Sequence, residues 1–148
     1  MASSDSRSGA PASIFDTLPM PPVAATLGWT LRAVDPEAGT IEVGFAAGQA
    51  FLNPTGSVQG GFLAAMLDDT MGPAVFAMGK GAIYAPTIDL NVSFLKPGRP
   101  GAFVGKGRVV SLGKSIAFLE GQLFDEAGAL VARATATARV MDAAKAIG

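Results

Sequence analysis

The feature that most constrains the fold is one long apolar segment in the middle of the chain, residues 53–78. Its first nine residues contain one proline, one serine and three glycines, a composition typical of a turn. From Phe62 to Met78 the segment is apolar on nearly every side, which indicates a helix that is buried all round. Aspartates, glycines and a proline interrupt the segment, so it does not resemble a membrane span. We therefore expect the central helix of a soluble domain.

Two carboxylates lie inside this helix, Asp68 and Asp69. Adjacent helical residues point about 100° apart, so the two side chains meet different surroundings. Both could stabilise local structure near Pro73, which cannot donate a hydrogen bond to the carbonyl of Asp69. Alternatively, one aspartate faces a cleft and acts as an acid, a base or a nucleophile. The residues alone leave both interpretations open.

The composition limits the chemistry of any site. The chain has 148 residues, enough for one domain with a substantial core. It contains neither cysteine nor histidine, which excludes disulfides, thiolate nucleophiles, histidine-based triads and histidine metal sites. We found no spacing of zinc or calcium ligands and expect no metal. Catalysis would have to use carboxylates, hydroxyls, amides, lysine or the backbone.

The N-terminus differs in composition from the rest of the chain. Residues 1–12 are small and polar, without the apolar core of a signal peptide, and we expect a disordered tail. Residues 13–148 are then one domain. In the absence of an export or membrane signal, we expect the protein to be cytoplasmic.

Strand patterns lie on both sides of the central helix. Residues 29–34 and 40–45 flank a turn and indicate a hairpin, and residues 14–18 suggest a short helical turn. Residues 87–94 alternate strictly, with Ile88, Leu90, Val92 and Phe94 on one face. Three further strands are expected at residues 103–110, 115–124 and 130–140, and short turns favour an antiparallel meander of these four.

Two of these strands carry small residues along one face. Alanine occupies every second position from 132 to 138, and Gly105 and Gly107 do the same in residues 103–110. Another element can approach such faces closely. The sequence therefore predicts an α+β domain in which a curved antiparallel sheet wraps one long helix. Only one face of the sheet meets that helix, so the other could be an oligomer surface.

This arrangement and one motif resemble a known family. Asn53, Gln59-Gly60-Gly61 and Asp68 follow the spacing of the phenylacetic-acid-degradation (PaaI-like) acyl-CoA thioesterases, which have the hotdog fold. The family has a histidine where this chain has Gln59. The resemblance covers roughly residues 28–140. It implies hydrolysis of an acyl-CoA to the free acid and coenzyme A, without any other cofactor, by a homodimer or homotetramer.

The resemblance also implies roles for individual residues. Asp68 would be the general base or the nucleophile, with Gly60 polarising the thioester carbonyl through the helix N-terminus. The other catalytic candidates are Asn53, Gln59 and Thr87. In related proteins the site forms between two subunits, so Thr87 and Asp68 could come from different chains. The remaining candidates would bind the substrate: Gly61, Lys96, Arg99, Gly113, Lys114 and Ser115.

The charge distribution is compatible with a small anionic ligand. Residues 80–114 contain six basic side chains and a single acid, in a chain whose net charge is −1. Lys96, Arg99 and Lys114 flank tight turns and could bind the phosphates of coenzyme A, although a solvated surface would have the same composition. No global excess of positive charge points to nucleic acid. Gln59 keeps open a second function, binding of acyl-CoA or another apolar ligand without hydrolysis, while the missing histidine disfavours a dehydratase or hydratase.

Overall fold

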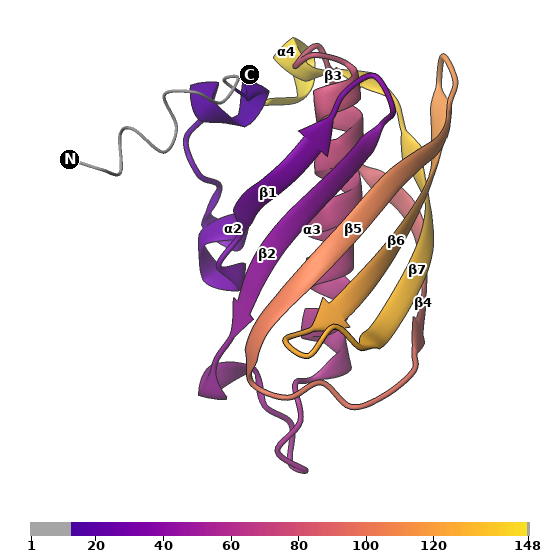
Figure 1. Ribbon diagram of the computed structural model, residues 1–148. Helices are drawn as coiled ribbons and strands as arrows, with labels where there is room; N and C mark the ends of the chain where they lie inside the picture. The colour runs from indigo at the N-terminus through magenta and orange to yellow at the C-terminus, as the bar shows by residue number, and fades with distance from the viewer. Residues whose placement is uncertain (1–12, 148) are drawn as a thin grey trace, which may run out of the picture.

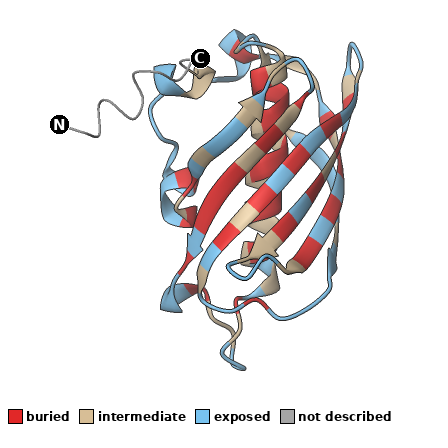
Figure 2. Cartoon of the chain, viewed as in Figure 1, coloured by how far each residue is buried: buried red, intermediate tan, exposed pale blue. Residues whose placement is uncertain are grey.

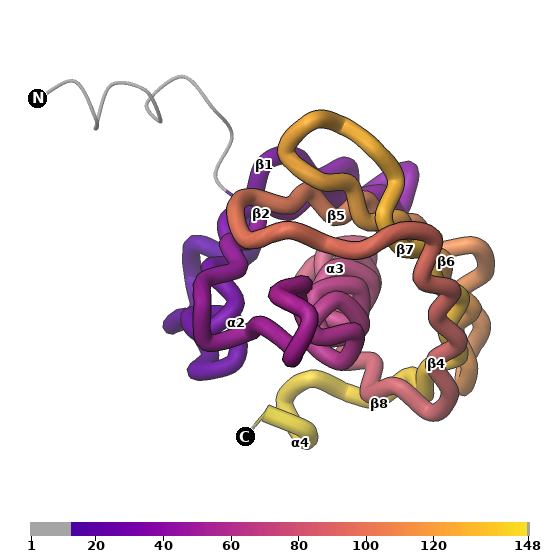
Figure 3. Tube along the Cα trace, turned by 90° about the horizontal axis from the view of Figure 1, so that it is seen from below, coloured from indigo at the N-terminus to yellow at the C-terminus, as the bar shows by residue number. Residues whose placement is uncertain are grey.

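The computed structural model describes residues 13–147 and has the architecture expected from the sequence. The long helix α3 (Gly60–Met78) packs against a curved six-stranded antiparallel sheet, an α+β hotdog arrangement (Figure 1). Viewed along α3, the sheet curves around the helix (Figure 3). The expected tail, residues 1–12, lies outside the described residues. The sheet contains β1 (Thr30–Asp35), β2 (Thr40–Ala47), β4 (Thr87–Phe94), β5 (Gly101–Leu112), β6 (Ile116–Asp125) and β7 (Leu130–Arg139).

The strand order corrects one prediction. The sheet runs β1-β2-β5-β6-β7-β4, so β4 is an edge strand paired with β7 and does not pair with β5. The expected four-strand meander is therefore wrong, and only β5, β6 and β7 form one. Between β4 and β5 the chain passes Pro97 and Pro100, and it crosses from one side of the sheet to the middle. The sequence periodicity does not show whether β4 pairs with β5 or with β7, because the same side chains are buried in either strand order.

The thin faces of the sheet lie against α3, as the small residues predict. A side chain on Gly105 would collide with Thr70 Oγ1, and one on Gly107 would come within 3.1 Å of the Thr70 methyl group. A Cβ on Gly121 of β6 would lie 3.0 Å from the side chain of Met71. The alternate alanines of β7 are buried as well (Figure 2). Any larger residue at these positions would push the helix away from the sheet.

Several short elements complete the fold, and all except the first helical turn were not expected. Pro22 begins the helix α2 (Pro22–Leu27) because a proline fits the first helical position, where no N–H is needed. Gly28 ends it with φ of 71°, a left-handed conformation that favours glycine. The others are η1 (Ile14–Thr17), which matches the expected helical turn, and η2 (Gln49–Phe51), β3 (Ile83–Tyr84), β8 (Met141–Asp142) and α4 (Ala143–Ile147).

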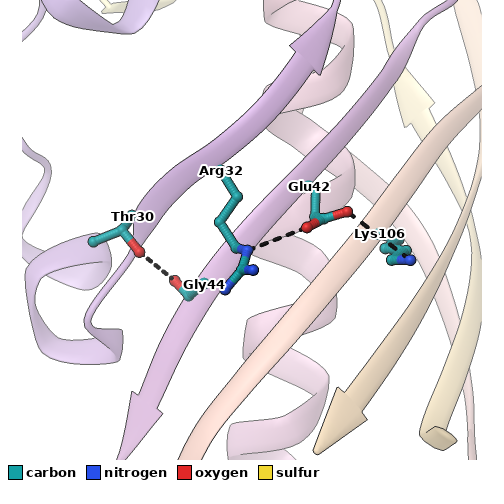
Figure 4. A network of polar contacts seen from close by, with 5 residues as sticks. All are labelled: Thr30, Arg32, Glu42, Gly44 and Lys106. Carbon is teal, nitrogen blue, oxygen red and sulfur yellow. Dashed lines mark hydrogen bonds and ion pairs between the residues drawn. The ribbon is translucent and has the colours of Figure 1, made fainter. Parts of the chain in front are cut away.

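The outer face of the sheet is polar and carries ion pairs. Glu42 lies between Arg32 and Lys106, at 3.1 and 3.9 Å, with Thr30 bonded to the carbonyl of Gly44 nearby (Figure 4). These groups are largely exposed, so each pair contributes little to stability. None of the helices within residues 13–147 combines the length and the hydropathy that crossing a bilayer requires.

Candidate active site

Asp68 and Thr87 meet halfway along α3. Thr87 begins β4, and its hydroxyl Oγ1 donates a hydrogen bond of 2.6 Å to Asp68 Oδ1 within the same chain. So short a distance is typical of a bond to a charged acceptor. It fixes the orientation of the carboxylate, and the described residues supply no side-chain donor to Oδ2. The preference of threonine for strands would by itself explain why Thr87 begins β4. The hydrogen bond to Asp68 is the observation that makes Thr87 part of the candidate site.

Asp69 has different surroundings. Its Oδ2 is buried without a hydrogen-bond partner among the described residues. The pKa of Asp69 is raised to about 6, chiefly by burial and to a smaller extent by the neighbouring charge of Asp68. A perturbed pKa often marks a functional residue. Of the two acids, Asp68 is the one whose carboxylate is oriented by a side-chain hydrogen bond, which comes from the hydroxyl of Thr87.

Gln59, Gly60 and Gly61 form the N-terminus of α3. Gln59 is the N-cap, and its side chain is exposed and caps nothing. The backbone N–H groups of Phe62 and Leu63 donate to the Gln59 carbonyl, whereas the described residues offer no acceptor to the N–H groups of Gly60 and Gly61. Unpaired amides and the helix dipole favour a partly negative oxygen here. This end of the helix can therefore polarise a carbonyl group.

Gly60 and Gly61 differ in what a side chain at each position would contact. A Cβ on Gly60 would lie 3.2 Å from the ring of Phe94, which covers this end of the helix. A Cβ on Gly61 would meet no atom within 4 Å. Packing inside the chain thus accounts for Gly60 in part and not at all for Gly61.

Asn53 is occupied in its own turn. Its Oδ1 accepts hydrogen bonds from the backbone and hydroxyl of Thr55 and from the backbone of Ser57, at 2.7 to 3.2 Å. Asparagine commonly forms such turns. The structure places Asn53 in the loop that leads to Gln59, where it shapes the approach to the helix N-terminus.

Gly60 and Asp68 of one chain are too far apart to act on one carbonyl group. They lie eight residues apart on a continuous helix, which is about 12 Å along its axis. A water molecule activated by Asp68 would not reach a carbonyl carbon whose oxygen is bonded at Gly60. Within a single chain, Gly60 and Asp68 therefore do not converge on one position.

The basic candidates lie at opposite ends of the sheet. Lys96 and Arg99 precede β5, and Gly113, Lys114 and Ser115 follow it, so twelve strand residues, about 40 Å, separate the two groups. Lys96 is paired with Asp125 at 3.2 Å. The pKa of Asp125 is lowered chiefly by the backbone N–H of Ala129, and Lys96 adds to this. One chain does not bring the five residues into one patch.

One face of α3 carries an uncovered stripe that was not among the predicted site residues as a group. Gly61, Ala65, Asp68 and Gly72 follow helical spacing on one face, and all four are exposed or half-buried. A Cβ on Gly72 would meet no atom within 4 Å, so nothing in the chain requires glycine there. Their spacing of 4, 3 and 4 residues was the signal in the sequence.

A hollow of about 790 Å³ opens on the outer face of the sheet, and all six strands contribute residues to its lining. None of the candidate residues lines it. Within residues 13–147, no cluster of three acidic side chains could hold a metal ion.

Comparisons with known proteins agree with this fold. A model of the thioesterase superfamily matches residues 55–132, which contain α3 and β4. A phenylacetic acid degradation-related protein of Ralstonia eutropha is 44% identical, with a TM-score of 0.80 over 85% of this chain and 95% of that one. No curated protein matches the chain.

Two more distant structures share the fold alone. The PaaI protein of Escherichia coli, from the phenylacetic acid degradation operon, is 21% identical, with a TM-score of 0.71 over 80% of this chain and 83% of that one. A Streptococcus mutans protein bound to acetyl CoA is 22% identical, with a TM-score of 0.70 over 77% of this chain and 89% of that one. The family model and the 44% identity are decisive: the chain belongs to the thioesterase superfamily.

Proposed function

We propose that this protein hydrolyses an acyl-CoA thioester to the free acid and coenzyme A. The observation that carries the proposal is the oriented carboxylate of Asp68, bonded to Thr87, on a helix whose N-terminus presents unpaired amides. Membership of the thioesterase superfamily supports the reaction type. A protein of the same fold binds acetyl CoA, which supports coenzyme A as the carrier.

The active site forms between two copies of the chain in this proposal. Two α3 helices in antiparallel contact, related by a twofold axis near Ala64 and Ala65, place Gly61 of one chain opposite Asp68 of the other. The stripe of small residues lets the helices approach closely, and twofold dimers are the commonest oligomers. Gly60 and Asp68 then act together although one chain holds them about 12 Å apart.

The edge of the sheet supports the same dimer. β4 is an edge strand, and Ile88 and Phe94 on it are 60% and 52% exposed. The alternation predicted for β4 is interrupted at Ile88, where the register with β7 shifts between Thr87 and Asp89. From Leu90 on, the apolar face remains partly open to solvent within one chain. An unpaired strand with exposed apolar side chains readily pairs with a second strand. Pairing of β4 with β4 of a second copy would cover these residues.

The reaction follows from these positions. The thioester oxygen accepts hydrogen bonds from the amides of Gly60 and Gly61, and the dipole of α3 stabilises the negative charge that develops there. Asp68 of the partner subunit removes a proton from water as the water oxygen bonds to the carbonyl carbon. The carbon–sulfur bond then breaks, and the sulfur takes the proton from Asp68 and leaves as coenzyme A. Alternatively, Asp68 itself bonds to the carbonyl carbon and expels coenzyme A as the thiolate, and water then hydrolyses the resulting anhydride to the free acid and Asp68.

Gln59 supports a second candidate function. An amide can donate a hydrogen bond to an acyl oxygen, but it cannot exchange a proton as histidine can. With Gln59 exposed at the helix N-terminus, a protein that binds acyl-CoA without hydrolysis is the alternative.

A panel of acyl-CoA substrates separates these functions, with release of the free thiol as the measurement. Hydrolysis predicts thiol release that is catalytic in protein and that saturates with substrate. Saturable binding with no thiol released from any member of the panel would leave only the binding function.

The nucleotide of coenzyme A has a candidate site as well. An antiparallel dimer brings the end of one sheet that carries Lys96 and Arg99 toward the end of the other that carries Gly113, Lys114 and Ser115. Exposed cations bind phosphate weakly and are screened by salt. The KM for acyl-CoA should therefore rise with salt, while the KM for a short thioester without the nucleotide should not. Equal salt dependence for the two substrates would place the nucleotide elsewhere.

A further inference from the structure

Pro73 leaves one carbonyl of α3 without its helical partner. In an α-helix each carbonyl accepts from the N–H four residues later, and proline has no N–H. The carbonyl affected is that of Asp69, and α3 nevertheless continues to Met78. A buried carbonyl without a donor destabilises the fold.

Trp29 supplies the missing donor from outside the helix. Its indole Nε1 donates to the carbonyl oxygen of Asp69 at 2.9 Å, across 40 residues of sequence. The side chain is only 9% exposed and packs against Phe15, with ring centroids 5.3 Å apart. Trp29 lies between α2 and β1, and its backbone N–H donates to the carbonyl of Ala24. The tryptophan is therefore held in place from the N-terminal side of the domain.

This bond acts on the turn that follows the candidate catalytic carboxylate. Asp68 immediately precedes Asp69, and a proline within a helix commonly kinks it at this turn. A kink at this turn would change how Asp68 faces Thr87 on one side and the helix of a partner subunit on the other. An indole bound to the freed carbonyl restrains this turn.

We propose that Trp29 is a positioning residue for Asp68, acting through its hydrogen bond to the carbonyl of Asp69. The proposal rests on the proposed function, since it concerns the same reaction. An aromatic ring without the N–H would fill the same space and leave the carbonyl free. The bond and the packing of Trp29 can therefore be separated by experiment.

A double-mutant cycle of Trp29→Phe and Pro73→Ala tests the proposal. Trp29→Phe should lower kcat for acyl-CoA by about tenfold with KM nearly unchanged, because a misplaced carboxylate slows the chemical step. In the Pro73→Ala chain, the N–H of residue 73 can donate to Asp69. There, adding Trp29→Phe should lower kcat by less than about twofold. Equal losses in both chains would overturn the proposal.

Phe15→Leu is the matched control for packing. It removes the ring that contacts Trp29 and leaves the indole N–H in place, so it should lower the melting temperature and preserve kcat. A loss of kcat as large as that of Trp29→Phe would show that packing, and not the bond, is what matters. If Trp29→Phe does not fold, replacement of Trp29 by benzothienylalanine keeps the ring shape without the N–H, and the same outcomes apply.

The bond itself can be observed without any activity. Trp29 is the only tryptophan of the chain, so the indole N–H gives a single NMR signal. This proton should exchange slowly with solvent, and rapid exchange would contradict the bond. If the wild-type protein hydrolyses no thioester, the proposed function and the positioning role both fail, whereas slow exchange would still establish the bond.

Discussion

Asp68 and Asp69 are neighbours in the sequence, but their side chains have different surroundings. Asp68 accepts a short hydrogen bond from Thr87, whereas one oxygen of Asp69 is buried without a partner. The acid with the raised pKa is Asp69, and the acid with the polar contact is Asp68. Each of these observations leads to a prediction.

Asp68→Asn should reduce kcat by about a hundredfold or more, because it removes the group that accepts the proton from water. Asp69→Asn is the matched control, with the same change of chemistry one residue away, and should reduce kcat much less. Steady-state hydrolysis of one acyl-CoA by both folded variants measures this. If Asp69→Asn proves the more damaging, the catalytic carboxylate has been assigned to the wrong residue.

Asp69→Asn should also stabilise the fold, and the gain should depend on pH. The pKa of Asp69 rises from 3.8 to about 6 on folding, so the folded state favours the protonated acid. Stability is therefore lost as the pH rises from about 4 to about 6, and the loss persists above that range. At about pH 7.5 the variant should gain roughly 1 kcal/mol after allowance for partial contact with solvent.

Chemical denaturation at several pH values checks this gain. The difference in unfolding free energy between the two proteins should be smallest below about pH 3, where Asp69 is protonated in both the folded and the unfolded wild type. A gain that stays constant across the whole range would mean that ionisation of Asp69 does not cause it.

At the scale of elements, α3 contributes both halves of the candidate site. Its first turn carries the amides of Gly60 and Gly61, and its middle carries Asp68. Proline is well suited to test the first turn, because it removes an N–H and is favoured at the first helical position. The preceding residue, Gln59, already has the extended ψ of 134° that proline requires.

Gly60→Pro should therefore lower kcat by about 10²–10³-fold, the usual effect of losing one donor to an oxyanion. Gly60→Ala is the control, since it makes the same approach to Phe94 and keeps the N–H. It should lower kcat only slightly. Equal losses for the two variants would attribute the effect to contact with Phe94.

The sequence predicts those elements whose signals are local. The apolar run of α3 and the alternation of β4 each identify an element, and the small residues of β5 and β7 identify faces that lie against the helix. The place of β4 at the edge depends on long-range pairing, which no local pattern encodes. The helix α2 was missed because Pro22 is compatible with both a turn and a helix start.

For the site, the resemblance names both Asp68 and Thr87 as candidates, and their catalytic roles stay predictions. The structure brings the two together in a contact between residues 19 positions apart. Asn53 was a candidate by spacing, but its side chain bonds to its own turn. Lys96 and Lys114 belong to the same basic segment of the sequence, yet the twelve residues of β5 separate them. Distances of this kind follow only from the folded sheet.

At the scale of the whole molecule, the proposed site needs two chains. The uncovered stripe on α3 and the exposed edge of β4 lie on surfaces that a second copy would cover. A dimer of this kind contains two sites, each with Gly60 from one chain and Asp68 from the other. A chain that lacks one half can then be complemented by a chain that lacks the other half.

The measurement that tests this most directly is the activity of mixed dimers of Gly60→Pro and Asp68→Asn chains. Each variant alone is defective at both sites. After the two are unfolded and refolded together in equal amounts, half of the dimers are mixed, and each mixed dimer has one intact site. The account predicts recovery of about a quarter of wild-type activity. If each site lay within one chain, every site would carry a defect, and activity no higher than that of the separate variants would contradict the account.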